Sequence, residues 1–397
     1  MKKINLAVFN TQPPHLYFGG VERRIIETAK SLNTQVNTTV YSGTKAGFKK
    51  PTSTNGIHFV PVFSTDILYP IDNWFFNNTL ADAVNTVKAD IYEAHTVSGY
   101  SFLRTLREKQ VKKPFIHTVH GVLADEYLQA IQRGTPTARA KLANFFMWQL
   151  SKLEMETAQK ATLTVTISNY SAQKIRQFYG VDKTKIRIVP NGVDTQRFKP
   201  SKASEKIKQQ IGINSKLCLL FVGRLIPRKG LTYLVAAAKH IVKEYPQTVF
   251  LIVGEGPQKG HLLAQVEKMK LSPNFVFLGD VNEKLLPALY NCADIFVLPS
   301  IQEGQGIALL EAQSTAKPVV AFNVGGVSEA VQDKVTGLLT KPDGKELADA
   351  VLKLLASWSL REDMGSNGRK FVLDNFSWDV CAQKLYGVYR EALAAVP

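Results

Sequence analysis

Residues 295–312 read IFVLPSIQEGQGIALLEA, and this stretch decides the fold. It opens on a short apolar run, Ile295–Leu298, which predicts a buried strand, and it closes on a pattern that predicts a helix over Ile307–Thr315. Gly306 stands where that helix begins. A strand that passes through a glycine-containing loop into a helix is the repeating unit of a parallel, doubly wound sheet.

The rest of the chain repeats this alternation of strands and helices. Apolar runs predict further strands at Ile4–Phe9, Asp90–Ala94, Phe115–Val119, Leu163–Ile167, Ile186–Val189, Leu217–Val222, Val249–Val253, Phe275–Leu278 and Val319–Phe322. Helical periodicity predicts helices at Val21–Leu32, Arg139–Lys160, Leu231–Glu244 and Phe376–Ala395. The turn Pro190-Asn191-Gly192 and the polar segment after it interrupt the series. We therefore predict two doubly wound, Rossmann-like α/β domains facing a central cleft, residues 1–193 and 194–376.

Length and charge support this division and narrow the range of partners. The 397 residues are 45% hydrophobic, enough for two cores. Net charge is +16. Residues 1–190 hold 24 Lys/Arg and 13 Asp/Glu, so most of the basic excess lies in the first half. A basic surface suits nucleic acid, an anionic membrane or a phosphorylated substrate, or it is simply solvated. Because no zinc finger, RNA-stacking motif or basic repeat occurs, nucleic acid is disfavoured.

Cysteine usage and hydropathy indicate a cytoplasmic protein. Cys218, Cys292 and Cys381 lie too far apart for a metal motif or a disulfide framework, so we expect them to pack as reduced thiols. The apolar run Ile4–Phe9 is too short for a signal peptide. No stretch approaches 18 consecutive apolar residues, so we expect no membrane span.

The loop and helix that follow Ile295–Leu298 suit a phosphate and hydroxyl groups. A helix N-terminus presents unpaired N–H groups and the positive end of a dipole, and glycine lets an anion approach that backbone. Glu303 lies just before the helix, and Glu311 lies inside it. Carboxylates beside a phosphate are tolerated when they accept hydrogen bonds from hydroxyls, which a ribose and a hexose both supply. The alternative is a surface loop with two solvated glutamates.

A second cluster, Gly223–Gly230, holds three cations directly after a predicted strand. Arg224, Arg228 and Lys229 leave the carboxyl end of Leu217–Val222, where cations can neutralise a diphosphate leaving group. We expect Arg228 to be the one that is merely solvated, since it adjoins two better placed cations. The alternative is an exposed basic loop.

Two weaker features lie in the first half. Gly19-Gly20, at a strand-to-helix turn, either permits close backbone contact with a ligand or only makes a tight turn. Strand alternation puts His117 on one face and His120 on the other, and His120, last before a glycine, can project into the cleft. We expect His117 to pack in the core, and the role of His95 is left open.

Missing motifs exclude several enzyme classes. The chain has no Asp-x-Asp, the usual carboxylate pair for a divalent cation on a nucleotide sugar. It has no Walker lysine loop, no Gly-x-Gly-x-x-Gly after the first strand and no Gly-x-Ser-x-Gly. A nucleotide hydrolase, a nicotinamide enzyme and a serine hydrolase are therefore disfavoured.

Taken together, the motifs resemble the retaining glycosyltransferases of family four (glycosyl transferases group 1), which have the two-domain GT-B fold. The likeness runs along nearly the whole chain. The matching segments are Gly19-Gly20, Thr118-Val119-His120, Ile167-Ser168, Val189–Asp194, Gly223–Gly230, Gly254–Pro257, Ala293–Ser300, Glu303 with Glu311, Pro318–Ala321, Gly325-Gly326 and Thr336–Leu339.

The resemblance implies roles for individual residues. The catalytic group that it implies is His120, Arg224, Lys229 and Glu303. Arg224 and Lys229 would clamp the diphosphate, and Glu303 would contact hydroxyls of the donor sugar. The donor contacts that it implies are Gly19, Gly20, Arg224, Lys229, Gly306, Ile307, Ala308 and Glu311, with Glu311 on the ribose. It also implies that the C-terminal helix, residues 377–397, packs back on the first domain.

The function implied is retaining, metal-independent transfer of a hexose-type sugar from a nucleotide diphosphate sugar to a hydroxyl of a glycan or glycolipid. No cofactor besides the donor and no metal ion is expected. One alternative is a non-catalytic nucleotide-sugar-binding subunit of a larger complex. Another is a nucleotide-sugar epimerase or an inverting transferase on the same fold.

Two residues depart from the family pattern. Gln305 stands between the glycines where the family usually has an aromatic residue. Ala316 stands near the end of the acidic helix where the family often has glycine, and a left-handed backbone there would cost roughly 1 kcal/mol.

The basic first half also suggests peripheral contact with the inner face of an anionic membrane. Candidate contacts are Lys49-Lys50, Lys112-Lys113 and the stretch Phe145-Phe146-Met147-Trp148. Phe145 and Trp148 are three residues apart, so both can face outward from one helix. The alternative is that these aromatic side chains pack the helix onto its sheet.

Overall fold

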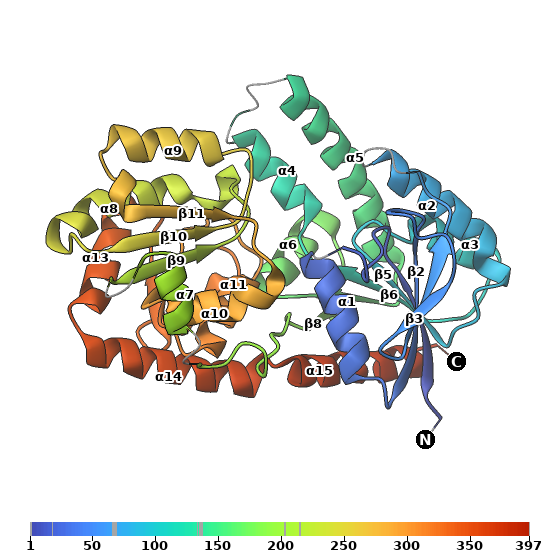
Figure 1. The fold of residues 1–397 in the computed structure, drawn as a ribbon. Coiled ribbons are helices and arrows are strands. Elements are labelled where there is room, and N and C mark those ends of the chain that lie inside the picture. The colour runs from blue at the N-terminus through green and yellow to red at the C-terminus, as the bar shows by residue number, and fades with distance from the viewer. Residues whose placement is uncertain are drawn as a thin grey trace. The chain divides into compact units, whose positions relative to one another are not determined.

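The computed structural model describes residues 2–17, 19–65, 70–132, 134, 138–201, 204–213 and 216–396. They form two compact units, one made of Met1–Asn191 with Trp378–Pro397 and the other of Gly192–Ser377. Each unit has a largely parallel sheet with helices on both faces (Figure 1). The predicted class of two doubly wound α/β domains is confirmed.

The first unit is built on an eight-stranded sheet in the order β3-β4-β2-β1-β5-β6-β7-β8. Its strands are β1 (Ile4–Phe9), β2 (Val36–Gly43), β3 (Thr52–Thr54), β4 (Ile57–Val62), β5 (Ile91–His95), β6 (Phe115–Val119), β7 (Leu163–Thr166) and β8 (Ile186–Ile188). Among the described strands of this sheet, only the β3–β4 pair is antiparallel. The carboxyl ends of the parallel strands therefore share one edge, which is where ligand-binding loops gather in such sheets.

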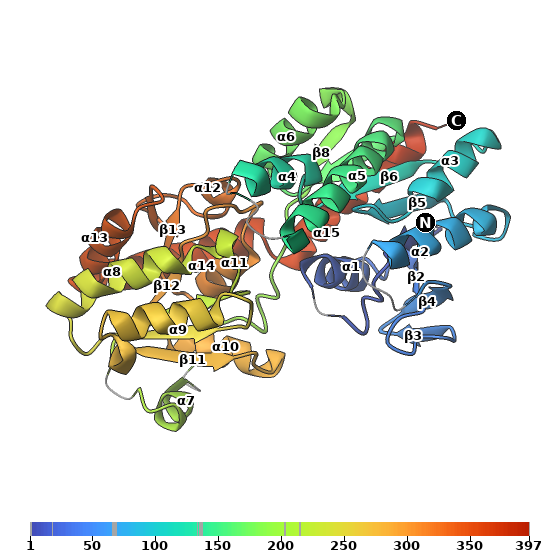
Figure 2. The same cartoon turned by 90° about the horizontal axis from the view of Figure 1, so that it is seen from above.

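Helices cover both faces of this sheet (Figure 2). They are α1 (Gly20–Ser31), α2 (Ile71–Asp82), η1 (Ala83–Asn85), α3 (Tyr100–Glu108), α4 (Leu123–Gln132), α5 (Ala138–Lys160), α6 (Asn169–Tyr179), η2 (Lys183–Lys185) and α15 (Trp378–Ala394). Alternation along β1 explains the two layers. Leu6 and Val8 pack with the side chains of α1 and α15, whereas Ala7 and Phe9 pack with those of α2 and α3.

The second unit has a six-stranded, all-parallel sheet in the order β11-β10-β9-β12-β13-β14. Its strands are β9 (Cys218–Val222), β10 (Val249–Val253), β11 (Phe275–Gly279), β12 (Ile295–Leu298), β13 (Val319–Phe322) and β14 (Gly337–Thr340). Its helices are α7 (Ser204–Gln210), η3 (Pro227–Lys229), α8 (Leu231–Glu244), α9 (Lys259–Lys268), η4 (Ser272–Asn274), η5 (Glu283–Leu285), α10 (Leu286–Cys292), α11 (Ile307–Ser314), α12 (Val327–Ala330), α13 (Gly344–Leu355) and α14 (Trp358–Asn375). Strand order changes direction between β9 and β12, so the loops after these two strands flank the switch point.

The turn that follows α11 contains an alanine with a left-handed backbone. Ala316 has φ of +56°. A Cβ placed on Gly365 of α14 would lie 2.2 Å from the Ala316 carbonyl oxygen, so α14 passes directly against this turn. The three cysteines are buried, as expected. Within the described ranges, no helix combines the length and the apolar character that crossing a bilayer requires.

Candidate active site

The loop after β9 brings its cations to the carboxyl edge of the second sheet. Gly223 has φ of +156° and Gly230 has φ of +63°, conformations that favour glycine. A Cβ on Gly230 would lie 2.0 Å from the carbonyl oxygen of Pro299, the residue after β12. Glycine is therefore required for this loop to lie against the backbone that follows β12.

This packing pairs Lys229 with Glu303. The Lys229 Nζ lies 2.5 Å from Glu303 Oε2, and both side chains are largely buried. Burial alone would raise the pKa of the Glu303 carboxyl, but the adjacent Lys229 ammonium, together with Arg228 and the Ser300 hydroxyl, more than offsets it, so the pKa lies below its usual value. The pair places an ionised carboxylate and a cation side by side, ready to accept from hydroxyls and to neutralise an anion.

The burial of the other two cations of this loop, Arg224 and Arg228, differs from the prediction. Arg228, predicted to be merely solvated, is half-buried and donates from Nη1 to the Gln302 carbonyl oxygen at 3.4 Å. Its own carbonyl oxygen accepts from Ile301 N at 2.9 Å. Arg224 is instead the exposed side chain. The prediction for Arg228 was wrong because the two loops pack together, and sequence position alone does not show which cation faces the neighbouring loop.

The start of α11 lies at the same edge. Gly306, the N-cap residue, has φ of +88° and has no side chain with which to cap the helix. Ile307 and Ala308 open the helix and are half-buried. Behind this segment, a Cβ on Gly325 would lie 2.0 Å from the Glu303 carbonyl oxygen, so that glycine supports the Glu303 backbone at close range. The uncapped amides have the geometry of an anion site.

Glu311 is oriented by a residue that the sequence analysis missed. The Tyr290 hydroxyl of α10 donates to Glu311 Oε2 at 2.6 Å, and both side chains are buried. No motif marks Tyr290. The one available indication was a tyrosine on an apolar helix, because a buried hydroxyl requires a hydrogen-bond partner.

Two family models match the two halves of the chain. The model described as Glycosyltransferase Family 4 matches residues 18–197, and the model described as Glycosyl transferases group 1 matches residues 203–371. The chain belongs to the family 4 (group 1) glycosyltransferases.

Characterised relatives of this family 4 chain use nucleotide sugars. It is 29% identical over 309 residues to the UDP-Gal:alpha-D-GlcNAc-diphosphoundecaprenol alpha-1,3-galactosyltransferase of Escherichia coli, covering 76% of this chain and 75% of the relative. It is 33% identical over 230 residues to the GDP-mannose-dependent alpha-(1-6)-phosphatidylinositol monomannoside mannosyltransferase of Mycobacterium tuberculosis, covering 55% and 59%. For five similar relatives, the match spans only 59–64% of the relative's own length.

Solved structures show that the fold is GT-B. The sucrose-phosphate synthase of Thermosynechococcus elongatus superposes with a TM-score of 0.82 at 20% identity, covering 99% of this chain and 100% of that structure. At this identity the likeness supports the fold alone.

In the first unit of this family 4 chain, Gly19 is the N-cap residue of α1 and lies next to the side chain of Glu22. A Cβ on Gly19 would lie 2.2 Å from Glu22 Oε2, so a larger residue there would require the Glu22 side chain to shift. Gly20 opens α1. Glu22 is buried, and its Oε1 accepts from Asn10 Nδ2 at 3.3 Å.

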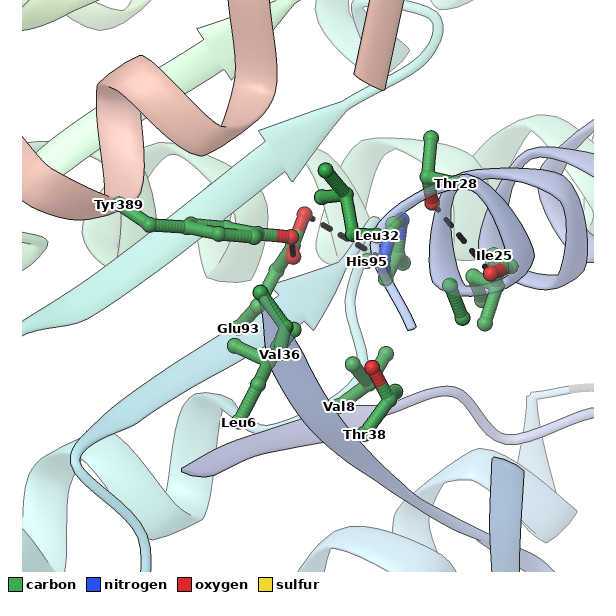
Figure 3. Close-up of a pocket in the computed structure, with 11 residues that line it drawn as sticks. Leu6, Val8, Ile25, Thr28, Leu32, Val36, Thr38, Glu93, His95 and Tyr389 are labelled. Carbon is green, nitrogen blue, oxygen red and sulfur yellow. Dashed lines mark hydrogen bonds and ion pairs between the residues drawn. The ribbon is translucent and has the colours of Figure 1, made fainter. Parts of the chain in front are cut away.

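His120 lies at the carboxyl edge of the same sheet, after β6, and is half-buried. Its Nε2 lies 2.8 Å from Nδ1 of His95, the last residue of β5. Behind His95 lies Glu93, which appears with His95 and Tyr389 around a small buried cavity in Figure 3. His117 packs in the core, as predicted, with Nε2 2.5 Å from the Thr96 carbonyl oxygen.

The candidate membrane residues do not form one surface. Phe145 and Trp148 of α5 are 51% and 37% exposed, so the alternative in which these two side chains pack the helix onto its sheet is wrong. Lys112 and Lys113 precede the amino end of β6. The C-terminal end of α5 also lies there, because Thr162 N, just after α5, donates to the carbonyl oxygen of Phe115 in β6. Phe145 lies about four helical turns before that end of α5 and is therefore distant from the two lysines. Lys49 and Lys50 precede the edge strand β3.

The described part of the chain contains no group of three His, Cys, Asp or Glu side chains placed to hold a metal ion.

Proposed function

We propose that this chain transfers a hexose-type sugar from a nucleoside diphosphate sugar to a hydroxyl of a glycan or lipid-linked acceptor, with retention and without a metal ion. The observation that carries the proposal is the Lys229–Glu303 pair, 2.5 Å apart beside the uncapped start of α11. The relatives named above support the donor class, since their names specify UDP-galactose and GDP-mannose.

The pair gives each part of the donor a partner. Lys229 neutralises charge on the diphosphate as it leaves, together with Arg224, whose exposed side chain is available to move onto it. The first amides of α11 bind phosphate oxygens or sugar hydroxyls. Glu303 accepts from hydroxyls of the transferred sugar, and Glu311 accepts from the ribose.

The transfer itself breaks the bond between the anomeric carbon and the phosphate oxygen. The acceptor oxygen bonds to that carbon on the face from which the phosphate departs, and the acceptor proton passes to the leaving phosphate oxygen. Protein cations take the place of a divalent ion in stabilising the departing charge. The absence of an Asp-x-Asp pair supports this assignment.

A donor screen tests the proposal. Purified protein is mixed with UDP- and GDP-linked hexoses, and thermal stabilisation identifies the donor. Transfer to a simple alcohol or glycan acceptor is then followed with and without excess chelator, and NMR of the product gives its anomeric configuration. A retained product at an unchanged rate is expected. Loss of turnover restored only by magnesium or manganese contradicts metal independence, and an inverted product contradicts retention.

We further propose that α4 and α5 attach the enzyme to an anionic membrane that holds its acceptor. The two helices pack together, and their exposed apolar side chains are Leu128, Ile131, Leu142, Phe145 and Trp148. Lys141 is exposed among them, and Lys152 Nζ lies 3.5 Å from the centre of the Trp148 ring. Interfacial aromatic groups with adjacent lysines match a bilayer surface of negative charge.

Co-sedimentation with vesicles tests this attachment. Protein is pelleted with neutral phosphatidylcholine vesicles and with vesicles that contain phosphatidylglycerol, at low and at moderate salt. We expect binding to the anionic vesicles only, with a steep fall as salt rises. Equal pelleting with both lipids, or with neither, contradicts the proposal and leaves the transferase assignment intact.

A further inference from the structure

We propose that Glu93 and His95 are positioning residues that fix the proton of His120 on Nε2, so that His120 presents an unprotonated Nδ1 to the donor sugar. The inference rests on the proposed function for its consequence, but its geometry lies wholly within the first unit. Glu93 and His95 lie on β5, with Glu93 deeper in the sheet (Figure 3), and His120 follows β6 at the carboxyl edge.

Glu93 is a fixed acceptor at the buried end of this chain of groups. Its Oε1 accepts from the Thr118 hydroxyl at 2.6 Å, and its Oε2 accepts from the Tyr389 hydroxyl of α15 at 2.6 Å. Both hydroxyl groups come from buried side chains. The carboxylate therefore cannot rotate away without breaking two hydrogen bonds in the core.

His95 is the group next to that acceptor. Its Nε2 lies 3.5 Å from Glu93 Oε1, and its Nδ1 lies 2.8 Å from His120 Nε2. Burial lowers the pKa of His95 to about 4 and also lowers that of His120, so both rings are neutral near pH 7. Each ring then carries one N–H and one lone pair, and a single proton lies between the two rings.

The carboxylate decides which ring supplies that proton. If His95 carried its proton on Nδ1, its Nε2 lone pair would face the Glu93 oxygen with no proton between them. With the proton on Nε2, His95 is attracted to Glu93 and its Nδ1 accepts from His120. His120 must then be the Nε2–H tautomer. Its Nδ1 is an acceptor, suited to a sugar hydroxyl and unable to donate to the leaving phosphate.

The test determines by NMR which ring nitrogen of His95 and of His120 carries the proton. Nitrogen-15 correlation spectra of the imidazole rings distinguish the two neutral tautomers, and the seven histidines are assigned with His95→Asn and His120→Asn variants. We expect His95 and His120 both to be Nε2–H in the unaltered protein. A spectrum that shows His120 as Nδ1–H overturns the proposal without any variant and without any activity measurement.

Glu93→Gln adds a second test, because its amide can donate to His95 Nε2 and so favours the opposite tautomer of both rings. We expect both tautomers to reverse and kcat to fall about tenfold with little change in the KM for the donor. Tyr389→Phe is the matched control. It removes the hydrogen bond to Glu93 Oε2, the oxygen that does not face His95, so the tautomers of His95 and His120 should stay unchanged. Unchanged tautomers in Glu93→Gln contradict the proposal. Absence of sugar transfer by the unaltered enzyme contradicts only the proposed function.

Discussion

The Tyr290 hydroxyl donates to Glu311 Oε2 at 2.6 Å, across 21 residues of sequence and from a neighbouring helix. The tyrosine thereby fixes the carboxylate of Glu311, which lies about one turn after the start of α11. Such preorganisation lowers the entropic cost of binding a ligand hydroxyl, because the acceptor does not have to be ordered when the ligand arrives.

Glu311→Gln should weaken binding of free nucleoside diphosphate, because the ribose loses a charged acceptor. The expected loss is about 1.5–3 kcal/mol. Tyr290→Phe should cost less, about 0.5–1.5 kcal/mol. Calorimetric titration with UDP and GDP measures both. Tyr233→Phe, a half-buried tyrosine on α8, is the control. Unchanged affinity in Glu311→Gln would show that the ribose assignment is wrong.

Glu303→Gln should act on the sugar rather than on the nucleotide. Removing this acceptor should weaken binding of the intact nucleotide sugar by about 1.5–3 kcal/mol, while the affinity for the free diphosphate changes much less. The same titration, run with the donor and with its diphosphate, separates the two effects. Equal losses for both ligands would place Glu303 on the diphosphate instead.

Lys229→Met should destabilise the fold in a pH-dependent way. The pKa of Glu303 is lowered in the folded protein, so the pair contributes stability above the unfolded pKa, and that contribution is lost as pH falls through the folded value. We expect a cost of roughly 1–3 kcal/mol at pH 7 that shrinks below about pH 4.5. Thermal unfolding at pH 7 and pH 4 measures it. Lys259→Met, in the half-exposed pair with Glu255, should change little at either pH.

Glu154 on α5 should show the opposite dependence. Its Oε2 accepts from Leu123 N at 3.0 Å and from the Tyr179 hydroxyl, and burial raises its pKa to about 8. A raised folded pKa contributes stability below the unfolded pKa that is lost as pH rises through the folded value.

The neutral variant Glu154→Gln should therefore match the unaltered protein at pH 5 and exceed its unfolding temperature at pH 9. Glu156→Gln, on the same helix with a pKa lowered to about 2 chiefly by its hydrogen bond with Arg104, should show no such gain. A constant difference between pH 5 and pH 9 would mean that Glu154 is ionised throughout.

Phe145→Ser with Trp148→Ser should reduce pelleting with anionic vesicles at least severalfold while leaving transfer to a soluble acceptor unchanged. The two side chains supply exposed apolar area on α5, since Phe145 is 51% and Trp148 is 37% exposed. Trp358→Ser, at an even more exposed tryptophan on α14, is the matched control and should pellet as before. Equal loss in both would indicate a general effect of surface hydrophobicity.

The local pattern of apolar residues was sufficient to predict the strands and helices that border the site. The apolar runs that become β9, β10, β12 and β13 are buried on both faces, so they are continuous in the sequence. The strands β2 and β3 were harder, because β2 (VNTTVYSG) is mostly polar and the edge strand β3 consists of Thr52–Thr54, all exposed.

Side-chain partners distant in sequence could not be predicted. Glu93 and Tyr389 are 296 residues apart, and nothing in either local pattern indicates the other. The choice between Arg224 and Arg228 likewise depends on how one loop packs against Gln302 in another. The sequence did not decide whether Phe145 and Trp148 of α5 face outward or pack onto the sheet, since an apolar stripe on a helix does not show what covers it.

The discontinuity of the first unit sets the order in which the chain can fold on the ribosome. Residues 192–377 form one continuous unit, whereas the unit that begins the chain is incomplete until residues 378–394 have emerged and α15 has covered α1. The later-synthesised unit can therefore finish folding first. Until then, Leu6, Val8 and their neighbours on the α15 side of the sheet have only α1 to cover them, so the nascent chain leaves part of an apolar face open to chaperones for most of its synthesis.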